Sequence, residues 1–173
     1  MNSETYSRYD TALLHIIAVL KSIDQAGINT IPFEGSWTAG QVTDHVLKSM
    51  DNMGHVLRNG TQPTDRPYDQ HKAMLEKVFL DYEHKMKSPD FIIPTNDPLE
   101  KKELINKLAA IRADTLDAIT TLDLTELCMS FEMPGMGYIT RYEFIWFTIY
   151  HTQRHTHQLE KIKEVLDKNE DKI

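Results

Sequence analysis

Hydrophobic residues recur at helical spacing in four segments of the chain. The apolar side chains stand three or four positions apart within residues 4–25, 38–58, 97–122 and 140–167, which places them on one face of a helix. We expect the first helix to end at Gly27, because glycine commonly follows a helix. The pattern therefore predicts four long helices.

Three of these segments open with a recognisable helix start. Thr38 with Gln41, and Thr140 with Glu143, have the spacing of a capping box, in which two side chains satisfy backbone N–H groups of the first turn. The segment that begins at Asp97 combines an acidic N-cap with proline at the first helical position and glutamate at the third. We therefore expect helices to begin just after Thr38, Asp97 and Thr140.

Four helices without a convincing sheet predict an all-α protein, a four-helix bundle in a single domain of residues 1–173. Residues 142–150 are rich in aromatic and β-branched side chains that suit a strand, but the capping box and the continuing helical spacing favour a helix. The long connection between the second and third helices, residues 59–97, carries a short extra helix at residues 74–82 and leaves the helix order open. Residues 123–139 are expected to form an irregular loop that can include a small hairpin.

The composition limits the class of protein. The chain has 173 residues, of which 40% are hydrophobic and 26% charged, as in ordinary globular proteins. Its net charge of −7 gives no general field that would attract nucleic acid or an anionic membrane. No stretch approaches the roughly 18 apolar residues of a membrane span. The single cysteine, Cys128, excludes an internal disulfide and a thiolate zinc site, fits the reducing cytoplasm, and is expected to be buried and unreactive.

Eight histidines stand out in this composition. On the fourth predicted helix His151 and His155 lie four residues apart within the apolar stripe, so their rings project side by side into the core. On the second helix His45 lies at the edge of the stripe. The other histidines fall on exposed faces or in the long connection: His15, His55, His71, His84 and His157.

Inward-facing histidines need partners for both ring nitrogens, because leaving either unpaired costs about 1–3 kcal/mol. A divalent ion would take the lone pairs of His45, His151 and His155 and leave their N–H groups for other acceptors. Three neutral nitrogens also leave coordination positions open, as in catalytic sites. The residues alone leave a second interpretation open, in which the three are hydrogen-bonded core side chains. A zincin protease is not expected, because no glutamate follows His151.

The same residues carry a resemblance to a known family. Residues 37–47 are similar to the segment of the DinB/YfiT-like superfamily in which Trp and Ser or Thr lead into a helix with a metal-binding histidine. Residues 139–158 resemble the final helix of that superfamily, with its H-x3-H-x2-Q signature, and the helix count and long connection also fit. The resemblance implies an up-down-down-up bundle that holds one divalent ion through His45, His151 and His155. Zinc or nickel is favoured, and iron and manganese are also compatible with imidazole ligands.

The resemblance also implies a function. Characterised relatives include metal-dependent transferases that conjugate low-molecular-weight thiols to electrophiles, others are described as hydrolases, and homodimers are common. A bound metal ion would lower the pKa of a thiol or water and present a nucleophile near neutral pH. We therefore expect a metal-dependent thiol S-transferase or hydrolase acting on a small electrophilic substrate. The alternatives are a non-catalytic helical module that binds a metal or ligand, and a purely structural bundle.

No catalytic residue can be assigned from the sequence. Asp44 and Glu143 are candidates for orienting ligand histidines, but Asp44 is expected to be exposed and Glu143 is already used by its capping box. Gln158 lies on the flank of the apolar stripe, where it can hydrogen-bond near the site or merely support the helix.

Overall fold

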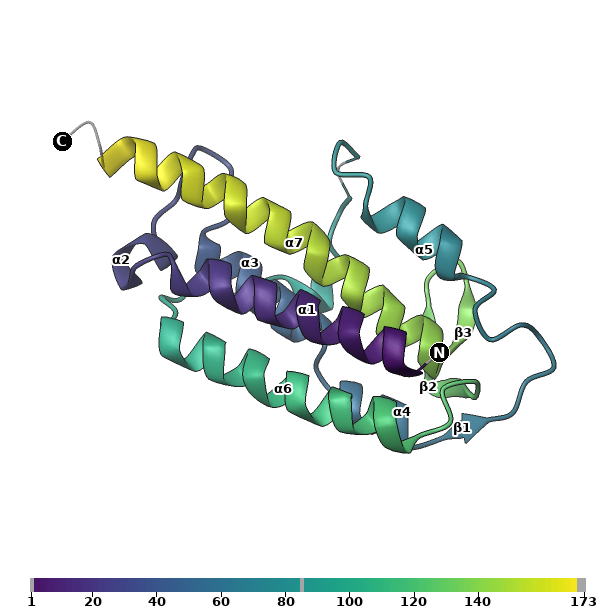
Figure 1. Ribbon diagram of the computed structural model, residues 1–173. Coiled ribbons are helices and arrows are strands. Elements are labelled where there is room, and N and C mark those ends of the chain that lie inside the picture. The colour runs from purple at the N-terminus through teal and green to yellow at the C-terminus, as the bar shows by residue number, and fades with distance from the viewer. Residues whose placement is uncertain (1, 85, 171–173) are drawn as a thin grey trace.

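The computed structural model describes residues 2–84 and 86–170, which form a mostly helical protein with a small sheet (Figure 1). The elements in chain order are α1 (Asn2–Lys21), α2 (Gln25–Ile28), α3 (Ala39–Ser49), α4 (Met53–Arg58), β1 (Thr61–Gln62), α5 (Lys72–Phe79), the 3₁₀ helix η1 (Asp90–Ile92), α6 (Lys101–Thr121), β2 (Leu127–Met133), β3 (Gly137–Thr140) and α7 (Arg141–Glu170). No helix of the described residues is long and apolar enough to cross a membrane.

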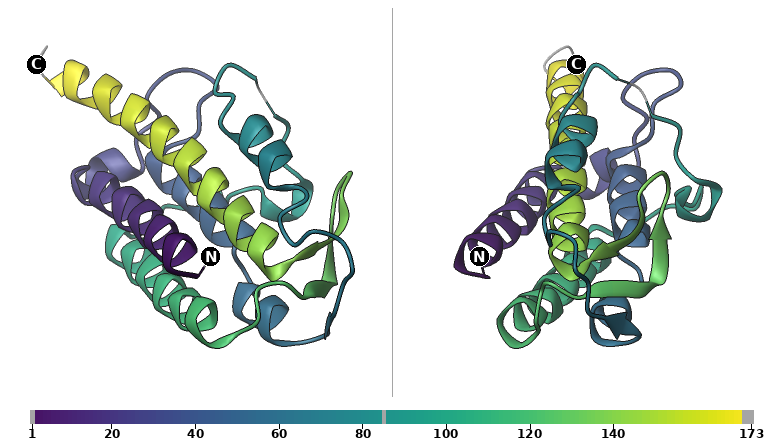
Figure 2. Two further views of the ribbon diagram at one scale, coloured as in Figure 1. Left: turned by 45° about the vertical axis from the view of Figure 1, so that its right-hand side comes forward. Right: turned by 90° about the vertical axis from the view of Figure 1, so that its right-hand side faces the viewer.

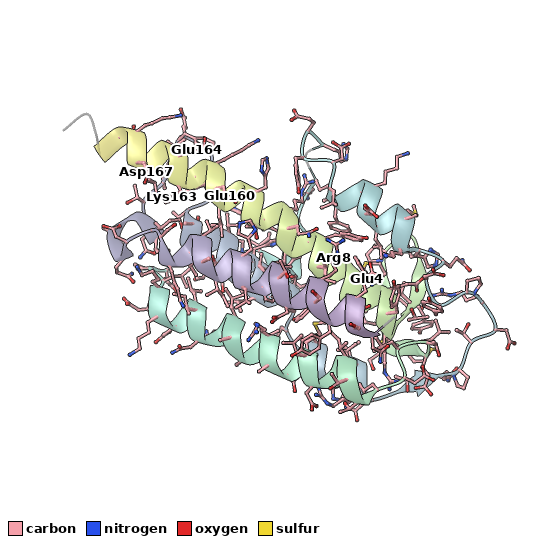
Figure 3. All side chains as sticks on the ribbon, viewed as in Figure 1. Glu4, Arg8, Glu160, Lys163, Glu164 and Asp167 are labelled. Carbon is pink, nitrogen blue, oxygen red and sulfur yellow. The ribbon has the colours of Figure 1, made fainter. Side chains whose placement is uncertain are left out.

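The core lies between α1, α3, α6 and α7. Helix α1 packs against both α6 and α7, and α3 contacts the same two helices from the other side, while α4 continues along α6 (Figures 1 and 2). The short helix α5 packs on the outside of α7, as the expected extra helix of the long connection. Helix α7 is the longest and ends in charged side chains that Figure 3 labels: Glu160, Lys163, Glu164 and Asp167.

Both predicted capping boxes are confirmed. The Thr38 hydroxyl accepts from the backbone N–H of Gln41, whose side chain accepts from the Thr38 N–H, both at 3.1 Å. At the start of α7, Glu143 Oε2 accepts from the Thr140 N–H at 2.9 Å and Thr140 Oγ1 accepts from the Glu143 N–H at 3.1 Å. The aromatic residues 142–150 are helical as predicted.

The expectation of an all-α fold is wrong in one region. Strands β2 and β3 form an antiparallel hairpin within residues 123–139 and just beyond, and β1 adds to its other edge, with Thr61 opposite Cys128. Gly135 and Gly137 turn the hairpin with φ values of +78° and +71°, which glycine adopts without a steric penalty. The small hairpin of this segment is therefore present, whereas the sequence gives no signal for its pairing with β1 of the long connection.

The second predicted helix is broken in the middle. It ends at Ser49 and resumes as α4 at Met53, and Asn52 between them has left-handed backbone with φ +59°. Asparagine tolerates this conformation better than most residues. The apolar stripe continues across the break, since Met50 and Met53 are both 2% exposed, so the hydrophobic pattern did not show it.

The first helix also ends earlier than expected. It stops at Lys21, and Gly27 lies inside the short helix α2, where its N–H donates to the capping Asp24 side chain at 2.6 Å. Glycine is needed there for space rather than for ending a helix, because a Cβ on Gly27 would lie 2.9 Å from Asp24 Oδ1 and Ile23 Cγ2.

The third helix begins three residues later than the Asp97-Pro98 signal predicts, at Lys101. The preceding residues are tied to α2 instead: the Leu99 N–H donates to Asn29 Oδ1 at 2.8 Å, and the Lys101 N–H donates to Gln25 Oε1 at 2.9 Å. These long-range bonds satisfy backbone groups that a local cap would otherwise have to satisfy.

Candidate metal centre

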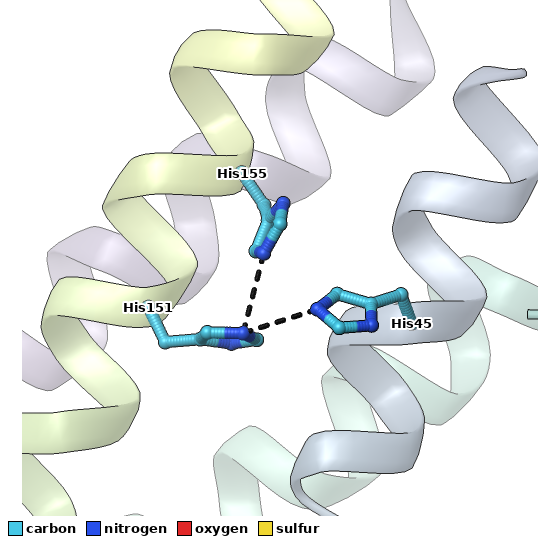
Figure 4. A group of neighbouring side chains, drawn as sticks. All are labelled: His45, His151 and His155. Carbon is cyan, nitrogen blue, oxygen red and sulfur yellow. Dashed lines mark hydrogen bonds between the residues drawn. The ribbon is translucent and has the colours of Figure 1, made fainter. Parts of the chain in front are cut away.

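Three histidines from two helices meet in the core. His45 comes from α3, and His151 and His155 come from successive turns of α7 (Figure 4). Their side chains are buried, with exposed fractions of 4%, 5% and 8%. The Nε2 atom of His151 lies 3.2 Å from Nε2 of His45 and 3.2 Å from Nε2 of His155. The structure thus brings together the three histidines that the helical spacing predicted to face inward.

The other nitrogen of His45 fixes the proton of that ring. His45 Nδ1 lies 3.0 Å from the carbonyl oxygen of Ile92, which can only accept a hydrogen bond, so Nδ1 carries the proton. Ser88 Oγ lies 3.3 Å from the same nitrogen. With Nδ1 protonated in a neutral ring, Nε2 of His45 presents a lone pair toward His151.

The same assignment holds for His151. Its Nδ1 lies 3.2 Å from Ser49 Oγ, and the Ser49 hydroxyl already donates its proton to the Val46 carbonyl at 2.7 Å. The hydroxyl oxygen can then accept from His151 Nδ1, an arrangement that leaves Nε2 unprotonated.

For His155 the acceptor is Gln158, whose Oε1 lies 2.9 Å from Nδ1. The expected hydrogen bond of Gln158 near the site is therefore present, one helical turn from the ring that it orients. All three rings are then Nδ1–H tautomers, and three Nε2 lone pairs converge with no hydrogen between them. Such a cluster is repulsive unless a cation binds it, so the tautomers fit a metal ion.

Burial keeps the three rings neutral. Desolvation lowers the pKa of His45 below its usual range, and it lowers the pKa of His151 much further, reinforced by the neighbouring His155. The pKa of His155 falls to about 3, again mainly because of burial. Neutral imidazole is the form that ligates metals, so at neutral pH the three rings are in the form that a metal ion would require.

The spacing of the nitrogens also fits an ion. Two nitrogens bound to one zinc ion at about 2.1 Å in a tetrahedral arrangement lie about 3.4 Å apart, close to the separations here. No carboxylate or thiolate of the described residues joins the three histidines. An ion held there would keep its full positive charge and at least one open position, which is the pattern of a catalytic rather than a structural site.

Similarity to known proteins identifies the family of this chain. The sequence profile of the family described as the DinB superfamily matches residues 9–159. The chain belongs to the DinB superfamily. It is also similar to "Uncharacterized protein YuaE" of Bacillus subtilis (strain 168), with 24% identity over 162 residues that cover 94% of this chain and 99% of the relative. No solved structure matches the chain.

The resemblance drawn from the two sequence motifs is therefore confirmed. In this DinB superfamily member, partly exposed aromatic rings surround the histidines. The ring of Trp37 lies 5.2 Å from that of His45, and the rings of Phe147 and Phe79 lie 5.4 and 5.8 Å from that of His151. A molecule that approaches the three Nε2 atoms would therefore meet apolar side chains.

Of the two other candidate residues, Glu143 forms the capping box expected of it, whereas Asp44 differs from its expected exposure. Asp44 is half-buried rather than exposed, and its Oδ2 accepts from the Thr95 N–H at 2.9 Å and pairs with Lys48 at 3.0 Å. Glu143 is fully buried at the start of α7 and pairs with Arg66 from the long connection, at 2.6 Å. Neither side chain belongs to the histidine cluster.

The remaining histidines lie outside the cluster, as the periodicity predicts. His15 is exposed and pairs with Glu160 at 3.0 Å, and His157 stacks on Tyr82 with ring centroids 4.3 Å apart. Cys128 is buried in β2, and burial raises the pKa of its thiol to about 12. It is therefore no nucleophile at neutral pH.

Sequence reasoning missed the acceptors that orient His45 and His151. Ile92 acts through its backbone carbonyl, which leaves no signal in the residue type, and Ser49 acts through the pairing of α3 with α7. Gln158 carried a signal, because a residue three positions after a helical histidine lies on the same face.

Proposed function

We propose that this protein is a metal-dependent enzyme that transfers a low-molecular-weight thiol to, or hydrolyses, a small electrophilic substrate. The observation that supports it best is the convergence of three Nε2 atoms whose Nδ1 atoms each lie within hydrogen-bond distance of an oxygen. A divalent ion bound there would lower the pKa of a thiol or water and supply a nucleophile near neutral pH. Zinc or nickel is the favoured metal, with iron and manganese as the other candidates.

Different residues of the chain would bind the ion, orient its ligands and exclude water. His45, His151 and His155 bind the ion, and Ile92, Ser49 and Gln158 fix the direction of their rings. The partly exposed Trp37, Phe79 and Phe147 exclude water beside the histidines and favour an apolar substrate body.

The proposal extends to the architecture and setting of the enzyme. We place α1, α3 with α4, α6 and α7 in the up-down-down-up order of a DinB-like four-helix bundle. We further propose that the enzyme acts as a homodimer in the cytoplasm, where thiols are reduced, with a small molecule as its substrate and no nucleic acid or membrane as partner.

A second candidate function has one observation in its favour. No described carboxylate or cysteine lies with the three histidines, so the cluster lacks an evident general acid or base. A non-catalytic module that holds a metal or a ligand needs none. Turnover separates this candidate from the enzyme.

The first experiment is elemental analysis of the purified protein and of the His151→Ala and His155→Ala variants. His157→Ala is the matched control, since His157 lies on the same helix outside the cluster. We expect about one equivalent of metal in the wild type and the control, and less than about a tenth in the other two variants. Less than a tenth in the wild type after reconstitution with zinc, nickel, iron and manganese would refute metal binding.

The second experiment tests catalysis with the reconstituted protein. Low-molecular-weight thiols are incubated with a chromogenic electrophile, and an ester substrate tests the hydrolase form. A rate above that of the metal-free protein, lost in His155→Ala and kept in His157→Ala, would support the enzyme. Rates equal to those of the metal-free protein in both assays would reject it in favour of the binding module.

A further inference from the structure

Arg154 lies between two of the clustered histidines in sequence, but its side chain reaches away from them. Its Nη1 donates to the carbonyl oxygen of Asp81 at 2.7 Å and to that of Phe79 at 3.3 Å, and its Nη2 donates to the carbonyl oxygen of His84. The ion pairs found in residues 2–84 and 86–170 do not include Arg154. The charged side chain of Arg154, beside the candidate metal centre, thus donates these hydrogen bonds to backbone carbonyls.

These carbonyls belong to the end of α5 and the turn that follows it. The last carbonyls of a helix lack intrahelical partners, and a cationic side chain satisfies them favourably. The same end of α5 carries Phe79, whose ring lies 5.1 Å from Phe147 and 5.8 Å from His151. Arg154 of α7 therefore holds in place the start of the segment that follows α5.

The later part of that segment reaches the other ligand-bearing helix. Ser88 Oγ and the Ile92 carbonyl lie 3.3 and 3.0 Å from Nδ1 of His45. One residue further, Lys48 of α3 donates to the Ile93 carbonyl at 2.8 Å. The described residues 79–84 and 86–93, which we name the strap, are thus anchored on α7 at one end and on α3 at the other.

The strap supplies the acceptor that determines the tautomer and direction of His45. The other two histidines do not depend on it in this way, because the acceptors of His151 and His155 are Ser49 and Gln158, on the two helices themselves. Loss of the Arg154 hydrogen bonds that hold the strap on α7 should therefore disturb the ring of His45 and not the rings of the other two histidines.

We propose that Arg154 is a positioning residue of the metal centre. By holding the start of the strap on α7, it keeps the Ile92 carbonyl and Ser88 against His45, so that the third Nε2 points toward His151 and His155. The expected effect of Arg154 on metal affinity rests on the proposed metal binding at the cluster. The expected effect of Arg154 on the His45 ring does not require a metal.

The test compares Arg154→Ala and Arg154→Lys with Arg58→Ala as the matched control. Arg58 also joins two segments, through Asp114 and Asp117, but on the side of α4 and α6. Binding of Co²⁺ is followed by visible absorption, and long-range ¹H–¹⁵N NMR of the metal-free protein reports which nitrogen of each histidine carries the proton. Far-UV circular dichroism checks the fold of each variant.

We expect Arg154→Ala to weaken Co²⁺ binding about 10- to 100-fold, as loss of an outer partner of a metal ligand does, and to change the spectrum of the bound ion. In the metal-free protein, the His45 signal should shift from the pure Nδ1–H tautomer while those of His151 and His155 stay. Arg154→Lys should fall between, because an ammonium lacks the planar fork of donors. Arg58→Ala should match the wild type throughout.

A merely structural cap on α5 predicts a different result. Arg154→Ala would then lower thermal stability while the Co²⁺ affinity, its spectrum and the His45 tautomer stay as in the wild type, and this outcome overturns the inference. If Arg154→Ala does not fold, the His45 signal of Arg154→Lys decides in the same way. If the wild type binds neither Co²⁺ nor zinc, nickel, iron or manganese, the proposed function fails, and the tautomer measurement alone decides about Arg154.

Discussion

Replacing the buried Glu143 by alanine should strongly destabilise the protein. The carboxylate is fully buried and accepts from the Arg66 guanidinium at 2.6 and 3.0 Å, from the His71 N–H at 2.7 Å and from the Thr140 N–H at 2.9 Å. Its removal leaves one charge and two backbone N–H groups without their partner. Each such N–H costs about 1–3 kcal/mol, and breaking a buried ion pair costs about 3–5 kcal/mol.

These figures do not add, because Arg66 is 20% exposed and can turn toward water. We therefore expect Glu143→Ala to lower the free energy of unfolding by about 3–5 kcal/mol. Urea unfolding of the metal-free protein, followed by far-UV circular dichroism, measures this change. Glu160→Ala is the control on the same helix, since the Glu160 side chain is 42% exposed, and it should change the free energy by less than about 0.5 kcal/mol. A loss below about 1 kcal/mol in Glu143→Ala would refute the reasoning.

Three further predictions follow from burial. Because burial lowers the pKa of His151 and His155, the unfolded chain binds more protons than the folded chain below about pH 6.5. The metal-free protein should therefore lose about 3 kcal/mol of its free energy of unfolding when the pH falls from 7.5 to 5.5. A urea midpoint that stays constant or rises on acidification contradicts this. Gly40→Ala should lower the melting temperature despite a better helix propensity, because its Cβ would lie 3.1 Å from the Ile28 carbonyl oxygen. Cys128 should not react with Ellman's reagent at pH 8 until urea unfolds the protein, since burial raises its thiol pKa to about 12; fast labelling of the native protein would show otherwise.

Local geometry explains what the sequence predicted correctly. A capping box such as Thr140 with Glu143 needs only residues three positions apart, and the pair His151 and His155 needs only one helical turn. His45 could be added because its position on the apolar stripe of α3 does not depend on distant residues. Helical periodicity was therefore sufficient to predict which three histidines come together, while metal binding itself stays a prediction.

Contacts between distant segments explain what was missed. The start of α6 is set by Gln25 of α2 and by Asn29, which follows α2, rather than by the Asp97 signal. Strand β1 exists only because the hairpin lies beside it. The acceptor for His45 is a backbone carbonyl 47 positions away, which any residue type could supply. Spacing along one helix carries no information about such partners.

The distance between the ligands along the chain has a consequence for folding. His151 and His155 are four positions apart, whereas His45 is 106 positions from His151. The close pair is ready as soon as α7 forms, but the third nitrogen arrives only when α3 docks on α7, a contact of high sequence separation. An ion that requires all three ligands is therefore captured late, after most of the chain is in place. Because late interactions act on the reverse reaction, such an ion would slow unfolding rather than speed folding.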